Sequence, residues 1–226
     1  MSNLSELLPT GGGQNAVDFV ASGTLSSGQA VALKSSGQVE AVAGVAQGVG
    51  AESVFESAQT DWITSTFDSN SNKVVIAYKD DANSNYGTAV VGTVSGTSIS
   101  FGTPVVFETG AASFISITFD SSSNRVVISY SDDGNSNYGT AVVGTVSGTS
   151  ISFGTPVVFE TGAASFISIT FDSSSNRVVI SYSDDGNSNY GTAVVGTVSG
   201  TSISFGTPVV FLSGYTFYTS AVYDSA

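Results

Sequence analysis

The sequence predicts an all-β fold of antiparallel four-stranded repeats of 52 residues, arranged as β-propeller blades and preceded by a short β segment. Residues 106–157 recur letter for letter as residues 158–209. A degraded copy, residues 54–105, precedes them, and residues 210–226 open a further copy. Self-similarity at a period near fifty residues indicates a stacked or radial repeat architecture, because one supersecondary unit cannot bury its own apolar faces.

The composition fits a folded domain and disfavours several classes of function. Hydrophobic residues make up 41% of the 226 residues and charged residues only 10%, so Ser, Thr, Asn and Gly supply the polar surface. A net charge of -13 repels nucleic acid and anionic membranes, and we expect neither as a partner. His and Cys are both absent, which removes the commonest general base and thiolate chemistry. We therefore expect no enzyme.

The N-terminal part divides into two segments. Residues 1–15 contain Pro9 followed closely by three consecutive glycines, which predicts a flexible attachment segment. Residues 16–48 form a small β preface, too short to hold a core alone, that serves as an anchor or as part of a blade. Its β-like runs, separated by Ser-Ser-Gly turns, are residues 17–24, 29–34 and 38–45. The repeat domain is residues 49–226.

Each copy of the repeat contains four strand-like runs. In the copy at 106–157 they are residues 114–119, 125–130, 138–146 and 149–153, the last extending past Gly154 and Pro156 to Phe159. Short polar turns join them, which predicts an antiparallel meander. In the first run Ile115, Ile117 and Phe119 share one face.

Apolar side chains on both faces of the meander decide the predicted architecture. Residues 126–128 and 141–143 are continuously apolar, so each small sheet must be covered on both sides. Sheets stacked on copies of themselves are propeller blades. We expect Gly139 and Gly144 where neighbouring blades approach closely. The alternatives are a β-sandwich, a β-solenoid and a string of independent hairpins.

Closure of the ring has two predicted forms. Propellers typically have four to eight blades, whereas this chain holds three full copies and the first strand of another, residues 217–224. In one form the preface donates its three strands to that strand and completes a mixed fourth blade. In the other the ring closes between chains, or continues in further sequence.

One polar loop offers candidate metal ligands. Oxygen-bearing side chains alternate from Asp133 to Asn137, as at the opening of a calcium loop, but Tyr138 stands where that loop has glycine. We favour a polar hairpin loop that uses the turn chemistry of Asp and Asn. We expect no cofactor other than calcium, whose candidate ligands are Asp133, Asn135, Asn137, Asp185, Asn187 and Asn189.

An aspartate ends the first strand of every copy. These residues are Asp68, Asp120, Asp172 and Asp224. A carboxylate here is expected to cap the following Ser-rich turn. The alternative is that the four line one end of a central channel and hold a cation.

Aromatic residues are the candidates for glycan contact. Tyr86, Tyr138 and Tyr190 follow Asn-Ser-Asn loops, a setting that suits carbohydrate stacking and equally a buried ring with its hydroxyl in a turn. Trp62, the only tryptophan, stands where the exact copies carry Phe, and we interpret it as a core aromatic. The loop at residues 131–135 is similar to the Asp-box of sialidase propellers, with its glycine one position early and no Trp after it. Sialidases also need an arginine cluster, and Arg125 and Arg177 are the only arginines.

Three stretches carry a resemblance to a known family. Residues 7–15 (LLPTGGGQN), 21–33 (ASGTLSSGQAVAL) and 139–154 (GTAVVGTVSGTSISFG) resemble repeat-bearing virion proteins of marine tailed bacteriophages, called tail fibre or structural proteins. The resemblance spans nearly the whole chain and contains no catalytic motif. It implies that the N-terminal segment attaches to other virion proteins and that the repeats project outward.

The expected function is therefore that of a structural virion component, a tail fibre or a capsid decoration, on the exterior of a phage particle. It would display a rigid acidic β surface and form a homo-oligomer. The alternative is a carbohydrate-binding propeller with one weak site per blade, strengthened by multivalency against a host surface glycan.

Overall fold

The N-terminal segment forms a small sheet of its own. The computed structural model describes residues 20–25, 31–41 and 50–224. The chain divides into two compact units, residues 1–49 and 50–226, the second of which we call the repeat domain. In the first unit β1 (Val31–Leu33) pairs with β2 (Val39–Ala41), and Ala21 forms a parallel bridge to Val39. Two of the three expected runs are thus strands, and the expected attachment segment at 1–15 lies outside the described residues.

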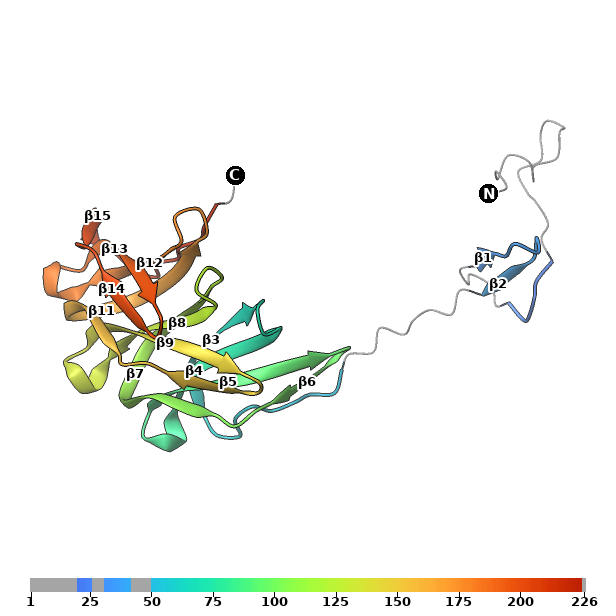
Figure 1. Ribbon diagram of the computed structural model, residues 1–226, viewed down its shortest axis with the longest axis horizontal. Coiled ribbons are helices and arrows are strands. Elements are labelled where there is room, and N and C mark those ends of the chain that lie inside the picture. The colour runs from blue at the N-terminus through green and yellow to red at the C-terminus, as the bar shows by residue number, and fades with distance from the viewer. Residues whose placement is uncertain (1–19, 26–30, 42–49, 225–226) are drawn as a thin grey trace, which may run out of the picture. The chain divides into compact units, whose positions relative to one another are not determined.

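The repeat domain is built from one antiparallel sheet of thirteen strands (Figure 1). The strands are β3 (Thr60–Asp68), β4 (Lys73–Asp80), β5 (Tyr86–Ser95), β6 (Ser98–Phe101), β7 (Val105–Asp120), β8 (Arg125–Asp132), β9 (Tyr138–Ser147), β10 (Ser150–Phe153), β11 (Val157–Asp172), β12 (Arg177–Asp184), β13 (Tyr190–Ser199), β14 (Ser202–Phe205) and β15 (Val209–Tyr215). The predicted all-β class and antiparallel four-strand repeat are confirmed. None of the helical turns in the described residues has the length and apolar character needed to cross a membrane.

Each copy contributes one four-stranded module. Module 2 consists of the end of β7, then β8 and β9, with β10 and the start of β11 both pairing with the far edge of β9. Module 1 has the same arrangement from β3 to the start of β7, and module 3 from the end of β11 to β15. Glycine at the tip of the hairpin between the third and fourth strands, such as Gly148 with φ 63°, supplies the left-handed backbone of the turn.

Successive modules share a strand, a connection that the repeat pattern in the sequence does not predict. The sixteen residues of β7 pair with β5 at their start and with β8 at their end. Two register shifts bend β7 between these partners, and at the bend the Glu108 carboxylate accepts the N–H of Gly110 at 2.7 Å. The expected extension of the fourth run from Phe153 to Phe159 is wrong at one point, because residues 154–156 interrupt the strand. There Gly154 donates to the Val143 carbonyl at 2.9 Å, while Pro156 has no N–H to donate.

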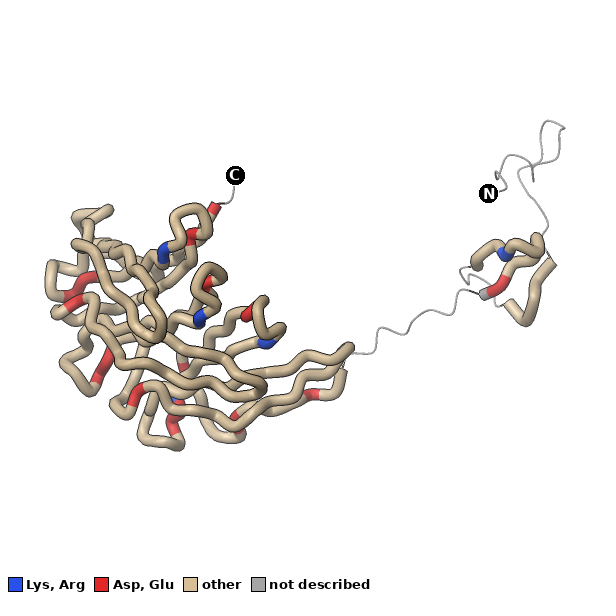
Figure 2. Tube along the Cα trace, viewed as in Figure 1, with Lys and Arg blue, Asp and Glu red and all other residues tan. Residues whose placement is uncertain are grey.

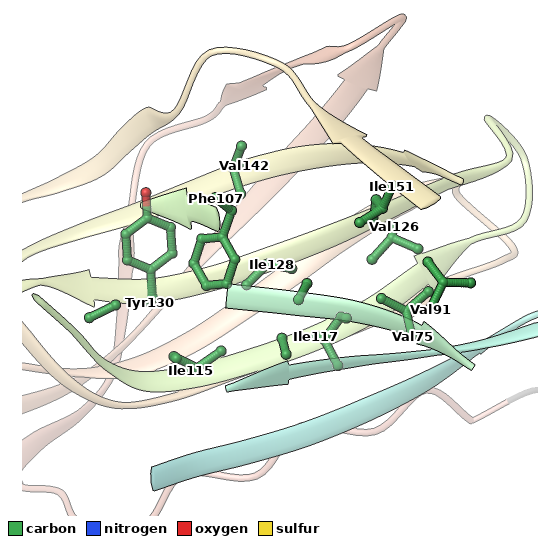
Figure 3. Close-up of a cluster of buried hydrophobic side chains, with 13 residues drawn as sticks. Val75, Val91, Phe107, Ile115, Ile117, Val126, Ile128, Tyr130, Val142 and Ile151 are labelled. Atoms are coloured by element: carbon green, nitrogen blue, oxygen red, sulfur yellow. The ribbon is translucent and has the colours of Figure 1, made fainter. Parts of the chain in front are cut away.

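Both faces of module 2 are buried between its neighbours. On one face Val126, Ile128 and Tyr130 pack in a cluster with Val75 and Val91 of module 1 (Figure 3). On the other face, the residues packed against module 3 are Val127, Ala141 and Val143. The prediction that each meander is covered on both sides is therefore confirmed for the middle copy. The strand order of the described residues ends at β3 and β14, so the sheet is not closed and the propeller ring stays a prediction.

Two glycines of β9 make room for side chains of their own module. A Cβ on Gly139 would lie 2.4 Å from Cε2 of Phe159, and one on Gly144 would lie 2.8 Å from Cδ1 of Ile151. Both partners belong to strands that pair directly with β9. The expectation that these glycines mark the approach of a neighbouring blade is therefore wrong: the close contacts come from rings and branches folded over the same sheet.

The start of the fourth copy continues the stacking. The N–H of Ala221 donates to the Ser168 hydroxyl at 3.1 Å, as the N–H of Ile169 donates to the Ser116 hydroxyl at 3.2 Å. Residues 217–224 thus lie along β11 in the way that β11 lies along β7. They are not themselves paired as a strand.

Candidate functional site

One aromatic residue from each copy joins a continuous row. The row consists of Trp62, Phe114, Phe166 and Tyr218, which occupy the same position in the four copies. Successive ring centroids lie 4.4, 5.1 and 4.9 Å apart, with the rings tilted or edge to face. We call this set the aromatic row.

A β-bulge places the first three rings of the row. In β7 the pairing with β8 shifts register between Ser113 and Ser116, and β3 and β11 shift at the equivalent points. The aromatic residue inside the shift has φ 52°, 50° and 50° in these three strands, and Tyr218, which is not in a paired strand, has φ 54°. Left-handed backbone is a genuine outlier for bulky residues. A bulge redirects a side chain out of the regular alternation, so the three bulges turn Trp62, Phe114 and Phe166 toward one line.

The aromatic row lines a cavity of about 210 Å³. Ile115, Ile167 and Thr219 complete its wall. Trp62 is 43% exposed and Tyr218 is 84% exposed, so the interpretation of Trp62 as a core aromatic is wrong. The bulge explains why Trp62 is exposed. It turns the Trp62 ring away from the face of the sheet that is buried at Ile115 and Ile117 in the next copy.

The predicted glycan-contact tyrosines lie elsewhere. Tyr86, Tyr138 and Tyr190 begin β5, β9 and β13 and are half-buried, each opposite an aspartate of the preceding strand. They occur one to a module and do not line the cavity.

The aromatic row was missed because strict alternation along residues 114–119 hides the bulge. The available signal was an aromatic residue at one position in all four copies.

The candidate calcium loops are short helical turns held by serines. Asp133–Asn135 is one turn of 3-10 helix, and the carboxylate of Asp133 accepts the hydroxyl of Ser113 at 2.8 Å. In the next copy Asp185 accepts the hydroxyl of Ser165 at 2.9 Å. Within the part of the chain that the structure describes, no group of three or more acidic side chains is placed to hold a metal ion. A calcium site at these loops stays a prediction.

The aspartates that end the first strands cap the turns that follow. Asp120 is 2% exposed, and its two oxygens accept the backbone N–H and the hydroxyl groups of Ser122 and Ser123 at 2.6 to 3.1 Å. Asp68 and Asp172 make the same kind of contacts, so the capping interpretation is confirmed for these three. Hydrogen bonds from Ser175 and Ser174 lower the pKa of Asp172 to about 2.

A buried tyrosine and a half-buried glutamate connect each pair of modules. The hydroxyl of Tyr130 donates to the Glu108 carboxylate at 2.8 Å, and Tyr182 donates to Glu160 at 2.9 Å. Burial, followed by the nearby Glu108 carboxylate, raises the pKa of Tyr130 far above its ordinary value. Burial and the same carboxylate also raise the pKa of Asp132. The Glu108 and Glu160 carboxylates each hold a tyrosine of the following module.

The arrangement is suited to contact and display. The aromatic row offers apolar ring faces and edges, and the polar turns repeat from module to module. Comparison with protein-family models, with curated proteins and with solved structures gives no match.

Proposed function

We propose that the protein is a structural component of a tailed-phage virion, a tail fibre or a capsid decoration, that displays its repeats on the particle exterior. The observation that carries the proposal is the burial of both faces of module 2 against its neighbours. Stacking of this kind makes a stiff body and presents the same polar turns at regular intervals. The resemblance of residues 7–15 and 139–154 to phage structural proteins supplies the assignment to a virion.

Particle association tests this proposal. Antibodies raised against residues 50–226 should label particles in immunogold electron microscopy, and the protein should band with particles in a density gradient. Antibody absorbed with the purified repeat domain is the control, and it should abolish the labelling. Protein that stays at the top of the gradient, away from the particles, would contradict the proposal.

Carbohydrate binding is a second candidate, and the exposed aromatic row favours it. Sugar rings stack on aromatic faces, and Trp62 and Tyr218 are both accessible at the cavity. The site would lie across copies, not once per blade. A row of this kind would give weak contacts that gain strength when several chains are displayed together.

Tryptophan fluorescence tests the second candidate directly, because Trp62 is the only tryptophan. Oligosaccharides identified on a glycan array should shift its emission, and Tyr218→Ala should weaken the titration at least tenfold. Tyr138→Ala is the matched control, because Tyr138 is a glycan contact predicted from the sequence that lies away from the cavity. It should leave the titration unchanged. An array without binding, or a titration lost with Tyr138→Ala alone, would count against binding at the aromatic row.

A further inference from the structure

Module 3 exposes a face that is buried in the other two modules. Val91 and Val143 are each 1% exposed, whereas the equivalent Val195 is 47% exposed. Phe107 is 6% and Phe159 7% exposed, and their equivalent Phe211 is 56% exposed. Residues 86–107, 138–159 and 190–211 are identical in sequence, so the difference in exposure comes from what lies against each face.

The neighbour that covers modules 1 and 2 is always the next module. Phe107 packs against Tyr130 and Phe153 with ring centroids 5.2 and 5.7 Å apart. Phe159 makes the same contacts in module 3, at 5.2 and 5.6 Å. The uncovered face of module 3, which we call the end face, is therefore one half of an interface that the molecule has already formed twice.

The end face differs from its internal equivalents in charge. Glu108 and Glu160 point at a tyrosine of the following module, and Leu212 stands at that position on the end face. Residues 190–223 contain no charged side chain, in a chain with a net charge of -13 (Figure 2). Two copies repel each other over most of their surface, and the end face is a place where they can meet without that repulsion.

Phe55 covers part of the opposite end of the stack, where Ile63 and Phe67 stay exposed. Phe55 lies 5.1 Å from Tyr78 and 5.8 Å from Phe101, the same contacts that Phe107 makes one module later. A second copy stacked head to tail would have to displace residues 50–59 to insert its own Phe211. Pairing of end face with end face needs no such displacement.

We propose that two copies of the chain associate through their end faces, module 3 against module 3, in a two-fold symmetric homodimer. Val195, Phe211, Leu212 and Tyr215 form its apolar centre. Residues 217–224 lie along β11, so three strands of the face are open. Three strands spaced about 4.8 Å apart and up to ten residues long give roughly 450 Å². Two such faces would bury about 900 Å², the size of a weak interface that dissociates on dilution. The inference goes beyond the proposed function and does not depend on it.

Sedimentation equilibrium of the 226-residue protein tests the proposal. The expected mass is twice the 22.8 kDa of one chain at high micromolar concentration, with dissociation on dilution. Leu212→Glu puts back the residue that the internal copies carry, and it should raise the dissociation constant at least tenfold because a buried carboxylate would lack a partner. Circular dichroism and the urea midpoint of this variant should match those of the wild-type monomer.

Ile63→Asp is the matched control, since Ile63 is 55% exposed at the other end of the stack. It should leave the dimer intact. A wild-type protein that is monomeric at high micromolar concentration would overturn the proposal. Loss of the dimer in Ile63→Asp as well as in Leu212→Glu would also overturn it, because that pattern indicates head-to-tail stacking.

Discussion

Three tyrosines at equivalent positions differ in one hydrogen bond. Tyr78, Tyr130 and Tyr182 are all fully buried. The hydroxyls of Tyr130 and Tyr182 donate to a glutamate of the preceding connection, whereas that of Tyr78 is buried without a partner among the described residues. Tyr78 is therefore a natural control for the hydrogen bonds that Tyr130 and Tyr182 make.

We predict that Tyr130→Phe lowers the free energy of unfolding by about 2 kcal/mol, the size of a hydrogen bond to a charged acceptor. Tyr78→Phe should be neutral or slightly stabilising, because it removes a buried hydroxyl that has no partner. Urea unfolding of the two variants measures the difference. Equal losses in both would show that the Glu108 contact contributes nothing.

The pH dependence of stability follows from three aspartates. Burial and a neighbouring glutamate raise the pKa of Asp132 and Asp184 above 3.8, so the folded chain binds their protons first. Their protonation should increase the free energy of unfolding as the pH falls from 7 toward 3.8. The pKa of Asp172 is lowered to about 2, so the stability it adds is present above pH 3.8 and is lost between 3.8 and 2.

Urea midpoints from pH 7 to pH 2.5 should therefore rise in mild acid and then fall. The double variant Asp132→Asn, Asp184→Asn should lose the rise and keep the fall. A wild-type midpoint that declines steadily from pH 7 downward would mean that these two carboxylates are not strained in the folded chain.

At the scale of elements, the turn after each first strand depends on one carboxylate. Asp120 holds the turn between β7 and β8 through four contacts with two serines while almost fully buried. Asp133, at the next turn, is exposed and accepts one serine hydroxyl. We therefore expect the two aspartates to contribute differently to the free energy of unfolding, although both lie at turns.

We predict that Asp120→Ala lowers the free energy of unfolding by about 2 kcal/mol, because four hydrogen bonds to a charged acceptor are lost. Asp133→Ala should cost less than about 1 kcal/mol, as expected for an exposed contact. Thermal and urea unfolding of both variants provide the comparison. A loss as large in Asp133→Ala as in Asp120→Ala would contradict the assigned role of the cap.

The strands could be predicted from the sequence, but the way they are joined could not. Alternation placed Ile115 and Ile117 on the buried face, and the polar clusters marked the turns at the ends of β8 and β9. The continuous β7 was missed because residues 108–113 read as a polar and small-residue connection, whereas the Glu108 carboxylate accepts the N–H of Gly110 there. The aromatic row was missed for a related reason: a bulge reverses the side-chain direction at Phe114 without any Gly or Pro to announce it.

At the scale of the whole molecule, stability is expected to grow with the number of stacked modules. Both sheet faces of module 2 are buried, and each junction between modules buries equivalent valines and phenylalanines. In such a stack the total stability is the sum of module and junction contributions. A string of independent hairpins would lack the junction contributions.

Deletion of residues 106–157 measures the junction contribution, because copies 2 and 3 are identical and the deletion joins Val105 to Val158 in the same sequence context. Urea unfolding of the shortened and full-length chains is compared in the Leu212→Glu background, so that association does not contribute. The stacked account predicts one cooperative transition with a lower midpoint and a lower m-value in the shortened chain. An unchanged midpoint, with only a smaller signal, would contradict it.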